Sequence, residues 1–267
     1  MKKPRSTIEI LKYLDKSNCR ECGHPACLAF ALAVFKGEAA LGDCPRVNPE
    51  IAREYDGDIP LKLEASANPE AEMLSNLQRQ IENIDLSTAA VRTGGRYADG
   101  RLVIKIFGKD FSVDARGGMA SDIHINQWVA GPVLNYVIES LGVPPSGKWV
   151  PLRELESGRS WNNFFIQRCE KPLKKVADTY TDFFKDIVEI FNGKPVESYR
   201  EADVSLVIHP LPLIPLLICY WEPEDDLPST LNLFFDANVE KNLPIRSIYG
   251  IGAGLAVMFE KLAMRHG

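Results

Sequence analysis

Four of the six cysteines in this chain fall within the first fifty residues, and thiolates are the protein ligands that soft metals prefer. The motif CRECGHPAC over residues 19–27 is followed, after a gap of sixteen residues, by Cys44 and a proline. Four thiolates are the usual complement of a 4Fe-4S cluster. Three ligands close in sequence can wrap one side of such a cluster, and a distant fourth can close it. The spacing predicts that Cys19, Cys22, Cys27 and Cys44 bind one 4Fe-4S cluster.

Zinc is the main alternative for the same four thiolates. A four-cysteine zinc site usually takes its ligands from two hooks, each with two cysteines separated by about two to four residues. Cys19 and Cys22 form one such hook, but Cys27 and Cys44 do not form a second. The spacing therefore favours an iron-sulfur cluster over zinc, and over cysteines that bind no metal.

Two short helices are expected to position these thiols. Residues Thr7–Lys16 place apolar side chains at helical spacing behind Ser6, a suitable N-cap. Residues Cys27–Ala40 have the composition of a second helix, which places Cys27 at its N-terminus. Unpaired N–H groups and the positive end of the helix dipole favour a negatively charged cluster there, and make it easier to reduce.

Histidines have simpler interpretations than ligation. His24 lies inside the cysteine loop, where an exposed side chain is the expectation. Asp122-Ile123-His124 is similar to the start of the Asp-x-His-x-x-Gly motif of cobalamin-binding domains, but Gln127 stands where that motif has glycine. His209 heads an apolar run and is expected to be buried with a hydrogen-bond partner. None of the three is predicted to be a ligand.

Two further patterns are interpreted as packing. Cys169 and Cys219 sit among large apolar residues and are expected in the core. The glycines of residues 250–254 lack the Lys-Ser/Thr pair of a phosphate loop, so close helix packing is the expectation.

Two charged groups are interpreted as structural or solvated. Arg153 and Glu154 are expected to form an ionic cluster with Asp236, which follows an apolar strand. The acidic residues between 222 and 226 are expected to form a solvated loop, with docking of a basic redox partner as the alternative. No nucleophile-base pair or hydrolase metal spacing is evident, so catalytic residues stay unassigned.

Composition and charge narrow the class of protein. The chain is 45% hydrophobic and 25% charged with a net charge of −5, which is typical of a globular protein and does not suggest nucleic-acid binding. Residues 6–16 offer no signal-peptide core, and three prolines in Val204–Trp221 argue against a membrane-spanning helix there. We expect a cytoplasmic protein with no membrane span.

The rest of the chain predicts a mixed α+β fold with two domains. Residues 1–60 form the cluster-binding module, 61–78 a linker and the start of a helix, and 79–267 a larger α+β domain. In its first half, pattern and turn signals predict a helix over 69–91, a hairpin over 101–115 around Gly108-Lys109, a helix opened by Pro132, and a strand or extended segment at 149–155. In its second half they predict helices between 161 and 191 divided near Pro172, strands at 204–208, 216–221 and 231–235, and a helix over 246–265.

Both parts resemble known families. The Cys-x-x-Cys-Gly-His-Pro-x-Cys core, Phe30-Ala31 and the closing Cys44-Pro45 resemble the 4Fe-4S module of the corrinoid iron-sulfur protein's large subunit and of the Rnf electron-transport complex. That resemblance implies four cysteine ligands and low-potential transfer of single electrons. GKWVPLREL (147–155), HPLPLIPLLICYW (209–221) and LNLFFD (231–236) resemble the family called domain of unknown function 3786. That resemblance implies an anaerobic setting but no activity.

The sequence therefore predicts an iron-sulfur protein that transfers electrons, or assists a redox system, with a partner protein or cofactor at the larger domain. Whether it is itself an enzyme is left open. One alternative is an enzyme whose larger domain binds a corrinoid or another cofactor that the cluster reduces. Another is a cluster that only stabilises the N-terminal module as a binding platform.

Overall fold

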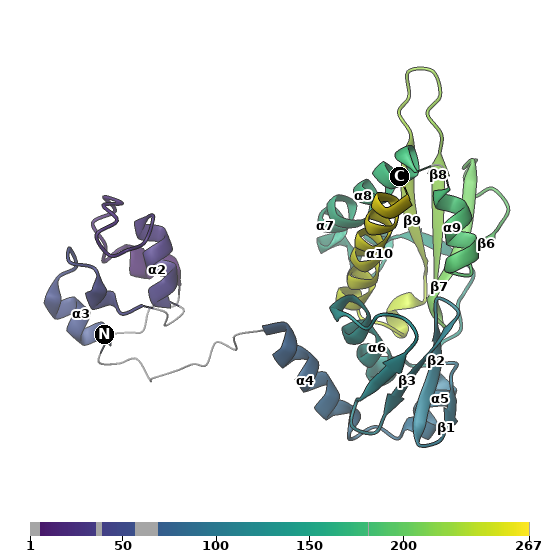
Figure 1. Ribbon diagram of the computed structural model, residues 1–267, viewed down its shortest axis with the longest axis horizontal. Helices are drawn as coiled ribbons and strands as arrows, with labels where there is room; N and C mark the ends of the chain where they lie inside the picture. The colour runs from purple at the N-terminus through teal and green to yellow at the C-terminus, as the bar shows by residue number, and fades with distance from the viewer. Residues whose placement is uncertain (1–5, 36–38, 57–68, 181, 267) are drawn as a thin grey trace. The chain divides into compact units, whose positions relative to one another are not determined.

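A computed structural model describes residues 6–35, 39–56, 69–180 and 182–266 of the chain (Figure 1). The chain divides into two compact units, Met1–Glu72 and Met73–Gly267. The first is helical, and the second combines helices with two antiparallel sheets, which confirms the predicted α+β class. The domain bounds inferred from sequence stay a prediction, and residues 61–68 of the predicted linker lie outside the described residues.

The helical unit is built from short elements around a small apolar core. The core side chains include Ile10, Phe30 and Leu41, none of which has any solvent exposure. As predicted, Ser6 caps the first helix, with its hydroxyl accepting a hydrogen bond from the Glu9 N–H. The helices of this unit are α1 Thr7–Leu11, α2 Cys27–Phe35, the 3-10 turn Leu41–Asp43, and α3 Pro49–Asp56. The first two are shorter than predicted, although residues 36–38 lie outside the described part of the chain.

The larger unit holds the remaining elements, with α4 beginning at the boundary between the units. Its helices are α4 Pro69–Ile81, α5 Leu86–Arg92, α6 Gln127–Glu139, α7 Asn162–Phe165, a π-helical turn Ile166–Glu170, α8 Lys171–Thr179, α9 Phe183–Ile190 and α10 Ile245–His266, with 3-10 turns at Leu152–Glu154, Gly158–Ser160 and Val239–Lys241. Its strands are β1 Arg96–Ala98, β2 Arg101–Ile106, β3 Lys109–Asp114, β4 Met119–Ser121, β5 Trp149–Pro151, β6 Lys194–Pro195, β7 Val204–Leu211, β8 Ile214–Trp221 and β9 Thr230–Asp236.

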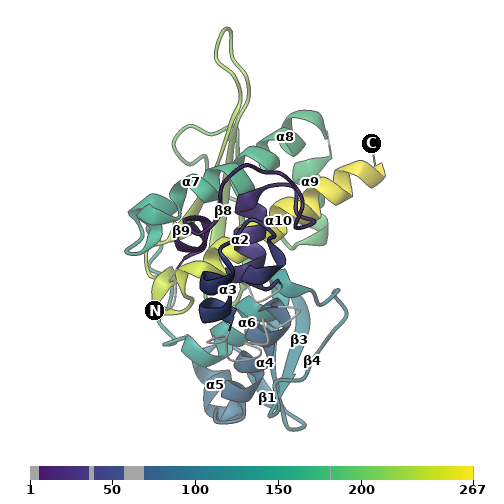
Figure 2. The same ribbon diagram turned by 90° about the vertical axis from the view of Figure 1, so that its left-hand side faces the viewer.

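A four-stranded sheet in the order β1-β2-β3-β4 contains the predicted hairpin, and α5 packs against β1 and β2 (Figure 2). The turn differs from the prediction by one residue. Ile106 pairs with Lys109, so Phe107 and Gly108 are the central residues, with φ of 47° and 79°. Two left-handed residues define a type I′ turn, whose twist matches that of the flanking strands. Gly108 therefore occupies the second central position rather than the first.

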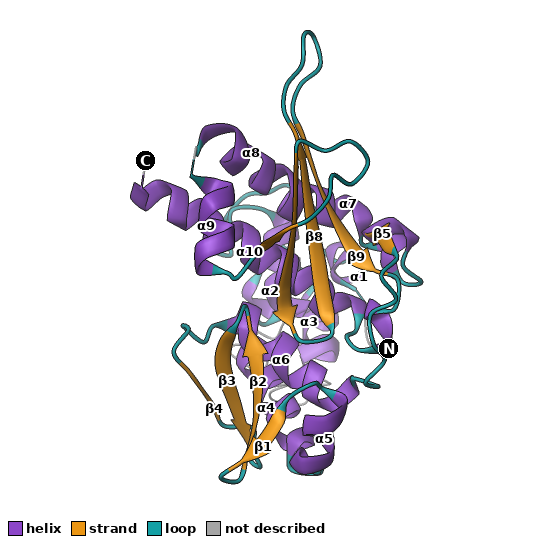
Figure 3. Cartoon of the chain, turned by 90° about the vertical axis from the view of Figure 1, so that its right-hand side faces the viewer, coloured by secondary structure: helices purple, strands orange, loops and turns teal. Residues whose placement is uncertain are grey.

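A five-stranded sheet in the order β5-β9-β8-β7-β6 forms the other half of the unit (Figure 3). The three predicted strands become its centre, β7 to β9. The helices α8 and α10 pack on one face, where Leu216, Leu233 and Phe235 enter the main core. On the opposite face, Leu217, Cys219 and Phe234 form a smaller apolar cluster.

Three helix boundaries in the larger unit differ from the sequence predictions. The helix expected over 69–91 is two helices, because Asp85 caps a second start by accepting the N–H groups of Ser87 and Thr88. Pro132 lies inside α6, which Asn126 caps, so the proline does not open that helix. Pro172 lies in the first turn of α8, where its missing N–H costs least, whereas α8 ends at Thr179 and α9 begins at Phe183.

The C-terminal helix α10 is the one helix in the described part of the chain that is long and apolar enough to cross a bilayer. Of this apolar window, 44% is buried inside the protein. Ile248, Leu255 and Phe259 enter the main core of the larger unit. Core packing within the larger unit thus accounts for part of its apolar character.

One buried phenol ties the two halves of the larger unit together. The hydroxyl of Tyr136, on α6, donates to the Thr93 carbonyl at 2.9 Å and accepts the Leu213 N–H at 3.2 Å. Thr93 ends α5 beside the small sheet, whereas Leu213 lies in the turn between β7 and β8. Burial raises the pKa of the Tyr136 phenol, so it remains a neutral donor and acceptor.

Candidate metal centre

The four motif cysteines all belong to the helical unit. Cys19 and Cys22 lie in the loop between α1 and α2 and are partly exposed. Cys27 is the first residue of α2, as predicted, and Cys44 follows the 3-10 turn Leu41–Asp43. Cys27 and Cys44 are buried in the core of the unit, and Cys22 packs against it. The unit thus offers two thiols from its core and two from its surface loop.

The loop that carries these thiols has an unusual backbone. Lys16, Asn18 and Arg20 have φ values of 61°, 53° and 66°, and Gly23 has 80°. Left-handed conformations are costly for residues other than glycine and concentrate at functional sites. An alternation of left-handed residues turns successive N–H groups toward one side, which creates the concave anion sites called nests that hold many Fe–S clusters. The backbone is therefore suited to a negatively charged group beside Cys19.

A reciprocal pair of hydrogen bonds joins this loop to α2. The Cys27 N–H donates to the side-chain oxygen of Asn18 at 2.8 Å, and the Asn18 N–H points to the Cys27 sulfur at 3.4 Å. The first bond caps α2, and the second directs a backbone N–H at the Cys27 sulfur. Sequence analysis did not single out Asn18, although its place directly before the first cysteine was visible.

Arg46 forms a second polar connection next to the cysteines. Its guanidinium contacts Glu21 at 2.5 Å and Asp15 at 3.3 Å, and it interacts electrostatically with the Cys19 thiol. The hydrogen bond from Arg46 lowers the pKa of Glu21, and backbone and side-chain bonds from Ser17 are the main cause of the lowered pKa of Asp15. Arg46 thus places a positive charge near the Cys19 thiol. Its two ion pairs also connect the ends of the segment from Asp15 to Glu21.

The pKa of the Cys44 thiol is affected by two of the other motif cysteines. Burial is the main cause that raises its pKa, and the nearby Cys22 and Cys19 raise it further. The N–H groups of Arg46 and Val47 act in the opposite direction by hydrogen-bonding to the thiol. Three of the four cysteines therefore interact electrostatically.

The described residues contain no group of three His, Cys, Asp or Glu side chains that already converges on a single metal ion. The donor set, all thiols, and the N–H groups directed at the sulfurs of Cys27 and Cys44 fit an iron-sulfur cofactor.

His24 lies in the loop between Cys22 and Cys27 and is partly buried rather than exposed as expected, with its ring 5.4 Å from that of Phe30. His124 is exposed. His209 is also exposed, which contradicts the prediction of a buried histidine; its carbonyl accepts the Phe107 N–H at 3.2 Å.

The predicted cluster of Arg153, Glu154 and Asp236 is wrong. Asp236 is 1% exposed, and its carboxylate accepts N–H groups from Ser146 and Gly147 at 2.9 and 2.7 Å. The carboxylate fastens a loop, and no arginine pairs with it among the described residues.

The expectations for the two remaining cysteines, for the exposure of the acidic loop and for the packing of Gly252 are confirmed. Cys169 and Cys219 have no solvent exposure, and the acidic residues of 222–226 are exposed in the loop between β8 and β9. This loop extends beyond the sheet (Figure 1). In α10, Gly252 packs on Phe165 and Cys169, so its role is close helix packing.

Comparison with known families gives two matches. A family model described as "Putative Fe-S cluster" matches residues 14–46, which span all four cysteines. A family model described as "Domain of unknown function (DUF3786)" matches residues 85–258, which is more than half of the chain.

Two curated relatives are informative. The "Corrinoid/iron-sulfur protein large subunit" of Moorella thermoacetica is 46% identical over 66 residues, which cover 25% of this chain and 13% of the relative. The "Acetyl-CoA decarbonylase/synthase complex subunit gamma" of Methanocaldococcus jannaschii is 44% identical over 200 residues, or 73% of this chain and 38% of the relative. The chain thus spans less than half the length of either relative. No solved structure matches.

Proposed function

The chain belongs to the family called domain of unknown function 3786, which brings no activity with it, and we propose that its function depends on one 4Fe-4S cluster bound by Cys19, Cys22, Cys27 and Cys44. The observation that carries this proposal is the loop backbone. Left-handed residues alternate before and within the first hook, and N–H groups point at the sulfurs of Cys27 and Cys44. This arrangement stabilises negative charge on a thiolate-ligated cluster.

The proposed role of the cluster is to carry single electrons at low potential. Four cysteine ligands leave no iron open to a substrate, so the cluster is suited to electron transfer rather than to catalysis at iron. Cys19 and Cys22 are partly exposed, which gives a partner a short path to the cluster. The electron passes to a redox partner protein or to a cofactor held by the larger unit. The relatives are named as corrinoid/iron-sulfur and acetyl-CoA decarbonylase/synthase subunits, so we propose an anaerobic and cytoplasmic setting.

A second candidate function is a corrinoid- or other cofactor-binding enzyme whose cofactor the cluster reduces. The match to the gamma subunit favours it, because that match extends over 73% of the chain and so beyond the cysteine motif. Optical absorption bands in addition to the broad iron-sulfur absorption would distinguish this candidate from a simple carrier.

Anaerobic reconstitution followed by metal analysis and spectroscopy tests the proposal. We expect about four irons per chain and a broad charge-transfer absorption. Dithionite, or a more strongly reducing donor, should give a spin-half signal in electron paramagnetic resonance that disappears on reoxidation.

Three alternative results would each contradict part of the proposal. Stoichiometric zinc in anaerobically isolated protein excludes the cluster. A cluster that stays silent at any accessible potential indicates a structural role. A signal that shifts when a small substrate is added indicates an open iron and thus an enzyme.

A further inference from the structure

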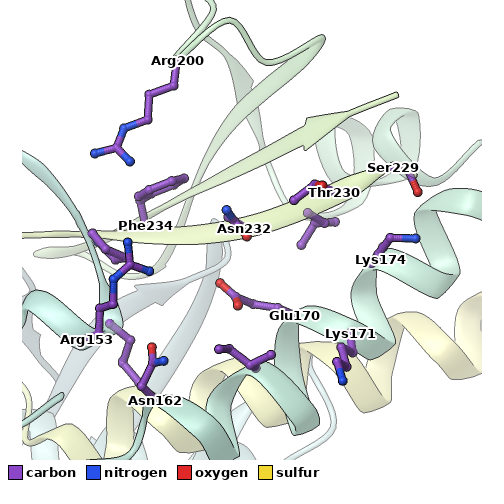
Figure 4. Close-up of a pocket in the computed structure, with 14 residues that line it drawn as sticks. Arg153, Asn162, Glu170, Lys171, Lys174, Arg200, Ser229, Thr230, Asn232 and Phe234 are labelled. Atoms are coloured by element: carbon purple, nitrogen blue, oxygen red, sulfur yellow. The ribbon is translucent and has the colours of Figure 1, made fainter. Parts of the chain in front are cut away.

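A cavity of about 320 Å³ lies within the larger unit beside β9. Its walls come from β9, the π-helical turn Ile166–Glu170, α8 and the segment that carries Arg200 (Figure 4). This volume is at the lower end of the range of small-molecule pockets and is too small for a corrinoid. The cavity therefore suits a compact ligand, whatever the cluster does.

Arg200 is held over the cavity by a strained backbone. Arg200 and Glu201 have φ values of 55° and 61°, and two consecutive left-handed residues without glycine are costly. The Arg200 carbonyl accepts the indole N–H of Trp221 at 3.2 Å, which fixes this conformation. As a result the Arg200 guanidinium lies 5.2 Å from the centre of the Phe234 ring. The segment thus holds a cation against the apolar wall of the cavity.

Arg153 supplies a second guanidinium from another segment. It extends from the 3-10 turn after β5 toward Phe234, as Arg200 does from the other side (Figure 4). In the described part of the chain neither arginine forms an ion pair, whereas Lys174 of the same cavity is paired with Asp178 at 2.6 Å. Arg153 interacts electrostatically with Glu170 but makes no close ion pair with it, so both guanidinium groups can still donate hydrogen bonds to carboxylate or phosphate oxygens.

Glu170 places an acceptor at the floor of the cavity. It ends the π-helical turn, a feature that often marks functional sites, and lies beneath β9 (Figure 4). One carboxylate oxygen accepts the Leu233 N–H at 3.0 Å, and the other makes no hydrogen bond within the described residues. No polar side-chain atom in the described residues is both buried and unpaired, so the second oxygen is accessible, and Glu170 lines the cavity. A hydroxyl or amine on a ligand could donate a hydrogen bond to this second carboxylate oxygen.

We propose that this cavity binds a small hydroxylated organic anion, a carboxylate or a phosphate ester. Arg153 and Arg200 hold its oxyanion, and Glu170 accepts a hydrogen bond from its hydroxyl. The amide of Asn232, which also lines the cavity, adds a polar contact between these ends.

Isothermal titration calorimetry of the full-length chain, with its iron content matched between samples, tests the proposal. The probes are malate and glycerol 3-phosphate as hydroxylated anions, succinate as an anion without the hydroxyl, and glycerol as the uncharged control. We expect saturable binding of malate or glycerol 3-phosphate, weaker binding of succinate, and none of glycerol. Arg153→Gln and Arg200→Gln should each weaken binding at least about tenfold, because each removes a charge-assisted hydrogen bond.

Arg116→Gln is the matched control, since it removes the same charge from an exposed position on the turn between β3 and β4. Unchanged affinity in this variant supports a specific site. Three results would overturn the proposal. They are an equal loss of affinity in all three variants, binding of glycerol as strong as that of the anions, and no saturable binding of any anion. Iron content and the cluster spectrum should be the same in every variant, so failure of this site is distinguishable from failure of the cluster.

Discussion

Asn18 and Cys27 bond to each other in both directions, with the asparagine side chain capping the helix and the asparagine N–H directed to the cysteine sulfur. One residue thus fixes the start of α2 and the environment of a proposed ligand. The left-handed φ of Asn18 makes both bonds possible, because it turns the N–H inward while the side chain reaches the helix end.

Asn18→Gly should destabilise the cluster and lower its reduction potential. Glycine keeps the left-handed φ but loses the side-chain oxygen, so the N–H to the Cys27 sulfur is held less firmly. Hydrogen bonds to sulfur stabilise the more negative reduced state, so their loss makes reduction harder. A redox titration followed by electron paramagnetic resonance measures the shift. Lys16→Gly, at the neighbouring left-handed residue, is the control and should leave the potential unchanged.

Serine substitution should divide the six cysteines into two groups. Cys19→Ser, Cys22→Ser, Cys27→Ser or Cys44→Ser should lose or degrade the cluster, because each removes one proposed thiolate. Cys169→Ser and Cys219→Ser should keep the full iron content, since both side chains lie in the core of the larger unit. Iron and sulfide analysis after anaerobic reconstitution checks this, and iron loss in either of the last two variants would contradict it.

Removal of the cluster should unfold the helical unit and leave the larger unit folded. The helical unit has short helices and a small core, so its stability depends on the metal. The larger unit buries most of the apolar side chains of the chain. After chelation, circular dichroism should retain a cooperative thermal transition. Limited proteolysis with mass spectrometry should recover a fragment that begins within about residues 56–70, and degradation of the whole chain would refute the prediction.

Glu170→Gln should stabilise the larger unit at pH 8 but not at pH 4. Burial is the main cause that raises the pKa of Glu170, while the Leu233 N–H and Arg153 lower it. A raised folded-state pKa means that stability is complete below about 4.3, the pKa of an ordinary glutamate, and decreases as the pH rises toward the folded-state value. Glutamine removes this loss and can still accept the N–H. Thermal unfolding of Glu170→Gln at both pH values measures the difference, with the exposed Glu154→Gln as a control that should show none.

Two glycine-to-alanine substitutions should have opposite effects on stability. A methyl group at Gly252 would lie 2.6 Å from Phe165 and 3.2 Å from the Cys169 sulfur, so Gly252→Ala should cost about 1–3 kcal/mol. A methyl group at Gly131, within α6, would meet nothing within 4 Å, so Gly131→Ala should gain up to about 1 kcal/mol through reduced chain entropy. Urea denaturation of both variants tests the pair, and equal loss would show that the helix α6 does not tolerate a methyl group either.

The elements that sequence analysis located best are those with local signals. The hairpin over 101–115, the central strands β7 to β9 and α10 have strong periodicity, and Ser6 has the residue type of a cap. The predicted turn lies one residue too far along the chain. A left-handed phenylalanine is rare, so the pattern favours glycine at the first central position, whereas Phe107 occupies it. Local pattern predicts a break near Pro172, although proline in a first helical turn is compatible with the helix.

The features around the sites were less predictable because they depend on contacts distant in sequence. Arg46 reaches Glu21 and Asp15 across the cysteine loop. Arg153 and Arg200 meet at one cavity only through the pairing of β5 with β9 and the strained turn before β7. Local pattern also assigned Asp236 to the wrong partners, because its true partners belong to a loop some ninety residues earlier.

The phenol of Tyr136 has a mechanical consequence for the larger unit. Its two hydrogen bonds connect the end of α5, beside the four-stranded sheet, with the turn between β7 and β8 of the five-stranded sheet. Opening either sheet would leave a polar atom unpaired in the interior, which costs about 1–3 kcal/mol. We therefore expect amide protons at the centres of both sheets to exchange with solvent through one shared opening, so that two sheets with no common strand behave as a single cooperative foldon.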